Sequence, residues 1–339
     1  MRTADFNFDL PPELIAQQPA EPRDSARLMV LRRAEKRIEH RRFSDLPSLL
    51  QRGDLLVVND TRVMAARLFG QRLETGGRVE ALLVRPLTDT RWEVLFRPSR
   101  QAMAGRTFAF ESTDGPLPAT VAGRSDGVVI LDFERPFDPA VVGSVPLPPY
   151  IKGYMGDPER YQTVYARYPR SAAAPTAGLH FTPALLVELA DAGIERAAVT
   201  LEVGPGTFKP VTVDDPRDHP LHEEQVTVPE TTAGAIGRTK REGGRVVAVG
   251  TTVVRTLEHV VRDCGEIRAY AGGTRLKILP GDPFLVTDVI ITNFHLPQST
   301  LLMLISAFAG TAFVMGAYRD AVRESYRFYS FGDAMLILP

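Results

Sequence analysis

The chain has 339 residues, enough for about two domains, and its 44% hydrophobic and 24% charged residues exclude intrinsic disorder and collagen-like structure. Its 40 basic and 41 acidic residues give a formal net charge of −1, which excludes a uniformly basic surface but allows a local basic face. The single cysteine, Cys264, excludes an intrachain disulfide framework and a cysteine-only zinc site. Because no apolar signal peptide opens the chain, we expect a cytoplasmic protein.

The N-terminal segment begins with proline-rich turns and then predicts two short strands. Residues 27–31 form the first, and residues 55–58 form a second, buried strand that ends at Asn59-Asp60. A basic cluster diluted by two glutamates lies between them and comprises Arg32, Arg33, Lys36, Arg37, Arg41 and Arg42. We favour a solvated hairpin turn for this cluster over a contact with nucleic acid.

Residues 62–145 have a different pattern, with short β-type runs separated by Gly, Pro and Asp. The clearest runs are residues 79–84, 92–96, 107–110 and 128–131. This regular spacing is typical of a small all-β barrel or sandwich.

The first part of this β module is basic. Residues 62–106 contain nine arginines and four acidic residues, so the excess there is +5. Such a module is suited to contact a phosphate backbone. The whole chain, however, has 35 arginines and five lysines, so the excess also fits a general preference for arginine. Both interpretations stay open.

After residues 146–149, helical and strand patterns alternate to the end of the chain. The predicted helices cover residues 182–192, 231–242 and 252–263, and the predicted strands cover residues 196–203 and 245–249. Thr182 is the expected cap of the first helix, with Pro183 at its first position. This alternation indicates an α/β layer with a mostly parallel or mixed sheet.

Residues 289–318 contain no charged side chain when His295 is neutral. This uncharged run is long enough for a membrane span. Polar residues interrupt the run, however, and Ser299 and Gly310 have the pattern of a helix cap and a helix stop. We therefore expect a buried core helix of about ten residues and no membrane contact.

The segment after Glu202 contains a glycine turn, with Gly204, Gly206 and Thr207. It is similar to the nucleoside-binding loop of a Rossmann-type methyltransferase that uses S-adenosylmethionine. That fingerprint needs a helix after the loop, whereas residues 208–213 are interrupted by proline and β-like. The pattern leaves either a glycine turn facing a ligand or an ordinary tight turn.

Gly250-Thr251-Thr252 lies between a predicted buried strand and a predicted helix, and Arg255 follows close to the first turn. The unpaired amides and positive dipole end of a helix favour a carboxylate or phosphate there. Ordinary helix capping explains the same threonines equally well.

Histidines and carboxylates supply the candidate acid–base groups. His219, His222, Glu223 and Glu224 cluster in a segment bounded by proline, without the spacing of a zinc helix. We favour acid–base work or substrate binding there over a metal site. His180 and His295 each lie between apolar neighbours, where a buried structural histidine is the common alternative.

Seven motifs in order give the chain a resemblance to one family. They are 59–70 (NDTRVMAARLFG), 173–182 (AAPTAGLHFT), 203–211 (VGPGTFKPV), 219–224 (HPLHEE), 250–258 (GTTVVRTLE), 292–303 (TNFHLPQSTLLM) and 326–335 (YRFYSFGDAM). The chain resembles the S-adenosylmethionine:tRNA ribosyltransferase-isomerases of queuosine biosynthesis over essentially its whole length.

The resemblance implies an α/β main domain, residues 1–61 with 146–339, interrupted by a β-barrel at residues 62–145. It implies transfer and isomerisation of the ribosyl part of S-adenosylmethionine onto 7-aminomethyl-7-deazaguanine at the tRNA wobble position. The product would be epoxyqueuosine-tRNA, with adenine and methionine released. S-adenosylmethionine is consumed as a co-substrate, and no metal or separate cofactor is implied. Nothing in the sequence requires a dimer, so we expect a monomer.

The expected site residues follow from these motifs. The candidates for proton transfer are His180, His222, Glu224, His295 and Asp333. The candidates for substrate binding are Thr176, Gly178, Gly204, Gly206, Thr207, Thr251, Thr252, Arg255, Asn293, Ser299, Thr300, Arg327 and Tyr329. The family usually has histidine at the position of Glu202, so any acid–base step made by that histidine must be made differently here.

Two other functions remain open at this stage. An RNA methyltransferase that uses the same donor would release S-adenosylhomocysteine in place of adenine and methionine. A non-catalytic tRNA-binding module would use the basic barrel alone.

Overall fold

The computed structural model describes residues 1–125, 128–204 and 211–339, and the chain divides into two compact units. The main unit comprises Met1–Arg62 and Pro149–Pro339, and the second unit comprises Val63–Pro148.

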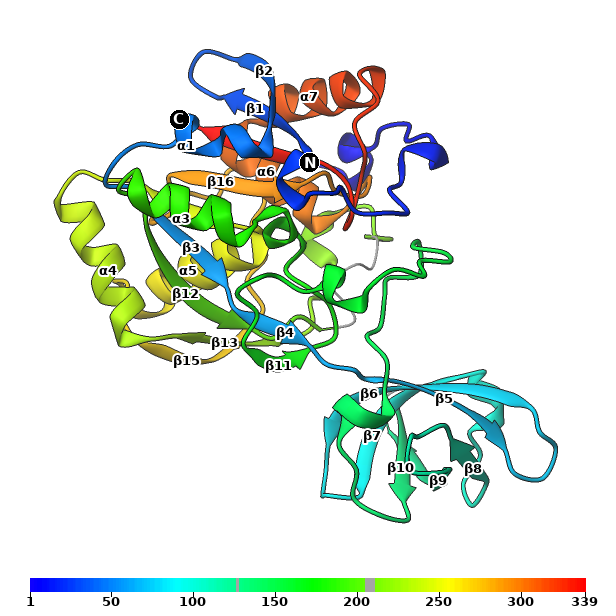
Figure 1. Ribbon diagram of the computed structural model, residues 1–339. Coiled ribbons are helices and arrows are strands. Elements are labelled where there is room, and N and C mark those ends of the chain that lie inside the picture. Colours follow the sequence, from blue (N-terminus) through cyan, green and yellow to red (C-terminus); the bar gives the residue numbers. More distant parts are fainter. Residues whose placement is uncertain (126–127, 205–210) are drawn as a thin grey trace. The chain divides into compact units, whose positions relative to one another are not determined.

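The main unit is built on a nine-stranded sheet (Figure 1). Its strands in spatial order are β15 (Tyr270–Thr274), β13 (Glu224–Val228), β12 (Glu195–Leu201), β3 (Leu55–Asn59), β14 (Val246–Val249), β16 (Val289–Asn293), β17 (Ala334–Leu338), β1 (Arg27–Arg32) and β2 (Arg37–Arg42). The neighbours from β12 to β16 pair in parallel, as do β17 and β1, whereas the other pairs are antiparallel. The sheet is therefore mixed, and the predicted α/β fold is confirmed.

Helices cover both faces of this sheet. One face packs against α4 (Glu230–Arg241), α5 (Thr251–Cys264), α6 (Thr300–Ala309) and α7 (Thr311–Arg323). The other face packs against α1 (Leu46–Leu49), α3 (Pro183–Asp191) and the 3-10 helix η7 (Thr176–His180). Successive side chains of a strand alternate between faces, so Leu55 and Val57 join the first core while Leu56 and Val58 join the second. Coverage on both sides explains why β3 is apolar almost throughout.

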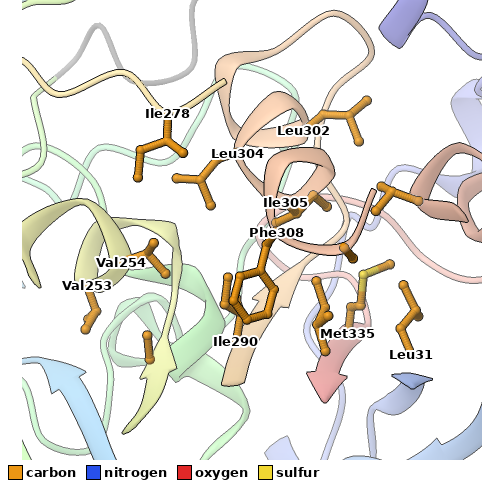
Figure 2. Close-up of a cluster of buried hydrophobic side chains, with 14 of the residues drawn as sticks. Leu31, Val253, Val254, Ile278, Ile290, Leu302, Leu304, Ile305, Phe308 and Met335 are labelled. Atoms are coloured by element: carbon orange, nitrogen blue, oxygen red, sulfur yellow. The ribbon is translucent and has the colours of Figure 1, made fainter. Parts of the chain in front are cut away.

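Helix α6 lies at the centre of the first core (Figure 2). Its side chains Leu304 and Phe308 gather near Val254 of α5 and Ile290 of β16. Ser299 caps the helix by accepting a hydrogen bond from the Leu302 amide at 3.2 Å, which confirms the predicted short core helix.

Among the described residues, no single helix is long and apolar enough to cross a membrane. Helices α6 and α7 pass that test of length and composition only as a pair, which is bent by 117°.

Other local predictions are also confirmed. Thr182 caps α3 by accepting from the Leu185 amide at 3.1 Å, and Pro183 is its first residue. The basic N-terminal cluster lies on the antiparallel β1–β2 hairpin, where Glu39 forms ion pairs with three arginines, Arg32, Arg37 and Arg41.

The second unit contains a closed antiparallel barrel, as predicted. Its strands in spatial order are β10 (Val128–Phe133), β7 (Arg91–Arg97), β6 (Arg78–Pro86), β5 (Arg67–Arg72), β8 (Thr107–Phe110) and β9 (Leu117–Ser125). Alternate residues of β6 and β7, such as Ala81 and Val94, fill the interior. Strands β5 and β9 contain Gly70, Gly123 and Pro118, which obscured the β pattern in the sequence.

The remaining elements are short. They are α2 (Pro139–Val142), the paired strands β4 (Thr61–Val63) and β11 (Tyr168–Ser171), and 3-10 turns at Thr3–Phe6, Pro12–Leu14, Arg23–Ser25, Phe43–Asp45, Ser99–Gln101, Pro158–Tyr161 and Pro216–Asp218.

One buried carboxylate fixes the entry to β16. Glu258 on α5 is fully buried, and its two oxygens accept hydrogen bonds from the amides of residues 285, 286 and 287 at 2.8, 3.1 and 3.0 Å. These bonds hold the segment that leads into β16 against α5.

Glu258→Gln should lower the free energy of unfolding by about 1–3 kcal/mol, because the new NH₂ group must face an amide donor. Urea denaturation at neutral pH measures the change. Glu266→Gln, which neutralises an exposed carboxylate just beyond the same helix, is the control and should leave stability nearly unchanged. Equal stabilities of the two variants would contradict the assigned role of Glu258.

Candidate functional site

A pocket in the main unit lies where the carboxyl ends of β14 and β16 meet the loop before β17. Its walls come from residues 150, 174–177, 203, 250–252, 292–296, 299, 301 and 329–330. Ligands of open α/β sheets bind at this edge, because the loops that follow the parallel strands converge there. The enclosed cavity measures about 60 Å³, far below the roughly 300–1,000 Å³ of pockets that bury a drug-sized ligand. It therefore encloses only part of a large ligand unless its walls move.

The amino end of α5 forms one wall. Gly250 follows β14 with φ of 93°, a conformation that L-residues with a side chain rarely adopt, and the helix starts at Thr251. The first amides of a helix have no intrahelical acceptor and carry a partial positive charge. The hydroxyl of Thr252 is buried and has no hydrogen-bond partner in the part of the chain that the structure describes. This wall is therefore arranged to accept an anionic or polar ligand group.

The side-chain amide of Asn293 joins two further walls of the pocket, which are formed by η7 and by the loop before β17. Its Oδ1 accepts from the hydroxyl of Thr176 on η7 at 2.9 Å, and its Nδ2 donates to the backbone oxygen of Tyr329 at 3.1 Å. Both groups of this buried amide are thus used to position the pocket.

Tyr329 has φ of 72°, which is strained for a bulky side chain. Its ring lies 4.8 Å, between centroids, from the ring of Tyr150, whose hydroxyl is 2.6 Å from Ser330 Oγ. Burial raises the pKa of Tyr329 to about 12 and also raises the pKa of Tyr150, so both phenols are neutral at pH 7. The paired rings offer an apolar face with polar tips at the pocket.

Tyr150 and Ser330 were missed in the sequence. Tyr150 directly follows a proline run that looked like a domain boundary, and Ser330 lies within a motif but has no pattern of its own. Only the fold brings these two residues together.

His295 is buried in the pocket wall. Its Nε2 lies 2.8 Å from the hydroxyl of Thr292, and its backbone amide donates to the hydroxyl of Tyr318 at 2.9 Å. Burial lowers the pKa of His295 to about 3, so the imidazole is neutral at physiological pH. A neutral imidazole has one donor and one acceptor nitrogen, so the ring can hydrogen-bond to a ligand group as well as to Thr292.

The neighbouring candidates on α6 differ in their roles. Ser299 lines the pocket, but its hydroxyl is used to accept from the Leu302 amide and to donate to the Leu296 carbonyl oxygen. Thr300 begins the helix and does not line the pocket.

His180 lies outside the pocket lining. It is buried, stacks on Phe43 with ring centroids 5.0 Å apart, and has its ring nitrogens 3.1 and 2.9 Å from the carbonyl oxygens of Ala177 and Gly332. Burial lowers its pKa. With backbone acceptors at both nitrogens, this geometry favours a structural role that links η7 to the loop before β17.

Glu224 and Arg255 form a buried ion pair, also outside the pocket lining. Arg255 Nη1 is 2.5 Å from Glu224 Oε2, and Arg255 Nε donates to the Leu276 carbonyl oxygen at 2.9 Å. The Gly204 amide lies 3.4 Å from the other carboxylate oxygen. The pair thus connects β13, α5 and the backbone at Gly204. Arg255 Nη2 has no partner in the described part of the chain.

Asp333 and Arg327 close the loop that carries Tyr329. The Asp333 carboxylate accepts from the amides of Arg27 and Arg327 at 3.0 and 2.8 Å, and from the Arg327 guanidinium at 3.1 Å. With its oxygens so engaged, Asp333 is placed to hold the loop and lies outside the pocket lining.

The other candidates are dispersed. His222 is exposed, and Glu202 lies 3.5 Å from Arg170 in a partly exposed ion pair. Gly178 has no room for a side chain, because a Cβ would lie 2.1 Å from the hydroxyl of Tyr165. Gly206 and Thr207 lie outside the described residues. Among the described residues, no group of three or more His, Cys, Asp or Glu side chains is arranged to hold a metal ion.

The basic excess between residues 62 and 106 is partly neutralised. Five of the nine arginines pair with a carboxylate: Arg62 with Glu159, Arg67 with Glu80, Arg72 with Glu74, Arg85 with Glu93, and Arg91 with Asp132. The other four, Arg78, Arg97, Arg100 and Arg106, make no ion pair within the described part of the chain.

Comparison with known proteins places the chain in a family. A family profile described as "Queuosine biosynthesis protein" matches residues 3–337. The chain belongs to the queuosine biosynthesis protein family. It is 54% identical to the S-adenosylmethionine:tRNA ribosyltransferase-isomerase of Symbiobacterium thermophilum and 53% identical to that of Moorella thermoacetica, each over 100% of both chains. These full-length likenesses support the ribosyltransferase-isomerase prediction and not the methyltransferase alternative.

The crystal structure of a relative supports the same assignment. The crystal structure of S-adenosylmethionine tRNA ribosyltransferase from Thermotoga maritima is 42% identical in sequence, with a TM-score of 0.59 over 98% of this chain and 100% of that one. The predicted enzyme class of this queuosine biosynthesis protein is thereby confirmed.

The lowered pKa of His295 predicts a loss of stability in acid. The unfolded chain takes up this proton near pH 6.5 and the folded chain only near pH 3, so between these values only the unfolded state binds it. Stability contributed by the neutral imidazole is therefore lost as pH falls from about 6.5 toward 3.

From pH 7 to pH 5, the wild type should lose about 2 kcal/mol more than His295→Gln. Urea unfolding at both pH values measures the difference, and the comparison cancels the titration of all other groups. Parallel losses in the two proteins would show that His295 is not buried and neutral.

Proposed function

We propose that this chain transfers and isomerises the ribosyl moiety of S-adenosylmethionine onto 7-aminomethyl-7-deazaguanine at the wobble position of a tRNA. The main support for this proposal is the 54% sequence identity, over the full length of both chains, to a relative named for this activity. The strand-end pocket supports it, because a helix amino end, a neutral histidine and paired aromatic rings surround one cavity. The products are epoxyqueuosine-tRNA, adenine and methionine.

S-adenosylmethionine occupies the pocket in this proposal. The amino end of α5 and the Thr252 hydroxyl bind the methionine carboxylate, since unpaired donors there face a cavity. The rings of Tyr150 and Tyr329 lie against the adenosyl or sulfonium part, for which an aromatic face is a favourable surface. The limited enclosed volume means that the walls adjust, or that part of the donor remains outside, where the tRNA base must reach it.

The reaction needs a base and a proton donor. The sulfonium acidifies the adjacent C5′ protons, a base removes one, and adenine leaves with a proton. The aminomethyl nitrogen then attacks the sugar, and methionine departs as the epoxide closes. His295 is the candidate within the pocket for one of these transfers, because its ring lies at the cavity and Thr292 fixes it.

Cofactor use, location and oligomeric state are part of the same proposal. S-adenosylmethionine is consumed as a co-substrate without a separate cofactor or metal. The enzyme acts in the cytoplasm as a monomer and without a membrane, where its tRNA substrate is available.

Thr252→Val tests the carboxylate site. Removing a buried hydroxyl that has no partner should leave stability equal or slightly higher, yet weaken S-adenosylmethionine binding about 5- to 30-fold. Thermal unfolding and isothermal titration measure the two effects.

Thr256→Val is the matched control one helical turn further on. Its hydroxyl donates to the Thr252 carbonyl oxygen at 2.9 Å and lies outside the pocket, so this variant should keep normal affinity. Equal affinities of the two variants would remove Thr252 from the binding site.

His295→Gln and His222→Ala together test the proton transfer. We expect adenine release in the presence of modified tRNA to fall at least about 100-fold in His295→Gln, in line with the usual contribution of a general acid or base. The sequence alone predicts instead that His222→Ala abolishes it. Mass spectrometry of adenine and of the tRNA base decides: loss in folded His222→Ala with activity kept in His295→Gln would assign the transfer to His222.

A further inference from the structure

A second cavity in the main unit is lined by arginines. It measures about 590 Å³, and its walls include Arg167, Arg170, Arg196, Arg238 and the half-exposed Tyr168. Only two acidic residues, Asp60 and Glu195, line it, so its four arginines leave an excess of +2. We call this hollow the arginine groove.

The groove forms where the sheet opens. Strand β12 pairs with β3 from Glu195 to Val199, but it pairs with β13 only at Thr200 and Leu201. The first half of β12 therefore has an edge that β13 does not cover. Helix α4 flanks the gap and is joined to it by a hydrogen bond of 2.6 Å from the Thr232 hydroxyl to the Ala198 carbonyl oxygen.

The arginines of the groove are available to a ligand. Arg167 and Arg196 form no ion pair among the described residues. Arg170 and Arg238 pair with Glu202 and Glu195 at 3.5 Å, and the arginine side chains in these pairs are 60% and 53% exposed. Such long, exposed pairs contribute little to stability and exchange readily for another anion.

The aromatic residues fit the same kind of ligand. The guanidinium carbons of Arg167 and Arg170 each lie 5.9 Å from the Tyr168 ring centroid, and that of Arg196 lies 5.8 Å from the Tyr165 ring. Of the two tyrosines, only Tyr168 lines the groove, and arginines beside such an aromatic ring are typical of surfaces that follow a nucleic-acid backbone. The one buried acid, Asp60, is held by the Thr200 hydroxyl at 2.7 Å.

We propose that the arginine groove binds the phosphate backbone of the tRNA beside the anticodon loop. This inference rests on the proposed function for the identity of the RNA. Strand β12 relates the two places, because Arg196 lies near its start and Val203, just beyond its end, lines the pocket. Seven residues of extended chain span at most about 23 Å, so the groove and the pocket lie close enough for one tRNA to reach both. A tRNA with its wobble base at the pocket can thus place stem phosphates in the groove.

The test compares two double variants that remove the same charge. Arg167→Gln/Arg196→Gln empties the groove of its two arginines that lack ion pairs. Arg241→Gln/Arg319→Gln removes two exposed arginines of the main unit that lie outside both cavities. The probe is a tRNA transcript that carries 7-aminomethyl-7-deazaguanine, and the readouts are its Kd over a range of KCl concentrations, KM, kcat and S-adenosylmethionine affinity.

The groove variant should bind this tRNA about tenfold or more weakly, and the slope of log Kd against log salt should fall by about 1.4–1.8 because two phosphate contacts are lost. KM for tRNA should rise, while kcat at saturating tRNA and S-adenosylmethionine affinity stay unchanged. A Kd and salt slope equal to those of the control variant would overturn the proposal. Wild-type protein that binds tRNA but releases no adenine would instead contradict the proposed function and leave the groove intact.

Discussion

The pocket depends on one buried side-chain amide, that of Asn293 at the end of β16. Its two groups bond to different segments, Thr176 on η7 and the backbone of Tyr329, so one residue sets the separation of two walls. Loss of either bond would leave a buried polar group unsatisfied, at a cost of about 1–3 kcal/mol. That constraint also explains how Tyr329 persists at a positive φ: its amide donates to the Phe294 carbonyl oxygen, its carbonyl oxygen accepts from Asn293, and Asp333 closes the loop. The strain is thus held by bonds on both sides.

The histidines show how environment separates two residues with similar sequence settings. Both lie between apolar neighbours and both are buried. His180 has a backbone carbonyl oxygen near each ring nitrogen and a phenylalanine ring against its face, so it supports the loop before β17, which carries Tyr329. His295 has one ring nitrogen beside a hydroxyl and lies at the cavity. The role of His180 is not visible in a local pattern, because its partners Gly332 and Phe43 are distant in the chain.

What the sequence could predict was local. The caps Thr182 and Ser299, the core helix after Ser299, the alternation that indicates an α/β layer and the barrel runs all depend on neighbouring residues, and the fold confirms them. The order of strands depends on long-range pairing, such as the insertion of β17 between β16 and β1, and no local pattern specifies it. For the site, Thr176, Thr251, Thr252, Asn293, His295, Ser299 and Tyr329 do line one pocket. Glu224, Arg255, Asp333 and His180 were chosen for their chemistry, yet they are engaged by partners that only tertiary structure brings to them.

The distribution of charge, like the site, depends on contacts that only the tertiary structure makes. A window of sequence finds the barrel excess, but carboxylates from within and beyond that window neutralise five of its nine arginines. The arginines of the groove come from three separate segments of the sequence, and the fold brings them to one hollow. Because salt screens charges beyond about 8–10 Å, a polyanion responds to the arginines gathered within that distance and hardly to the net charge of −1. The fold, by opening the sheet between β12 and β13, is what gathers them.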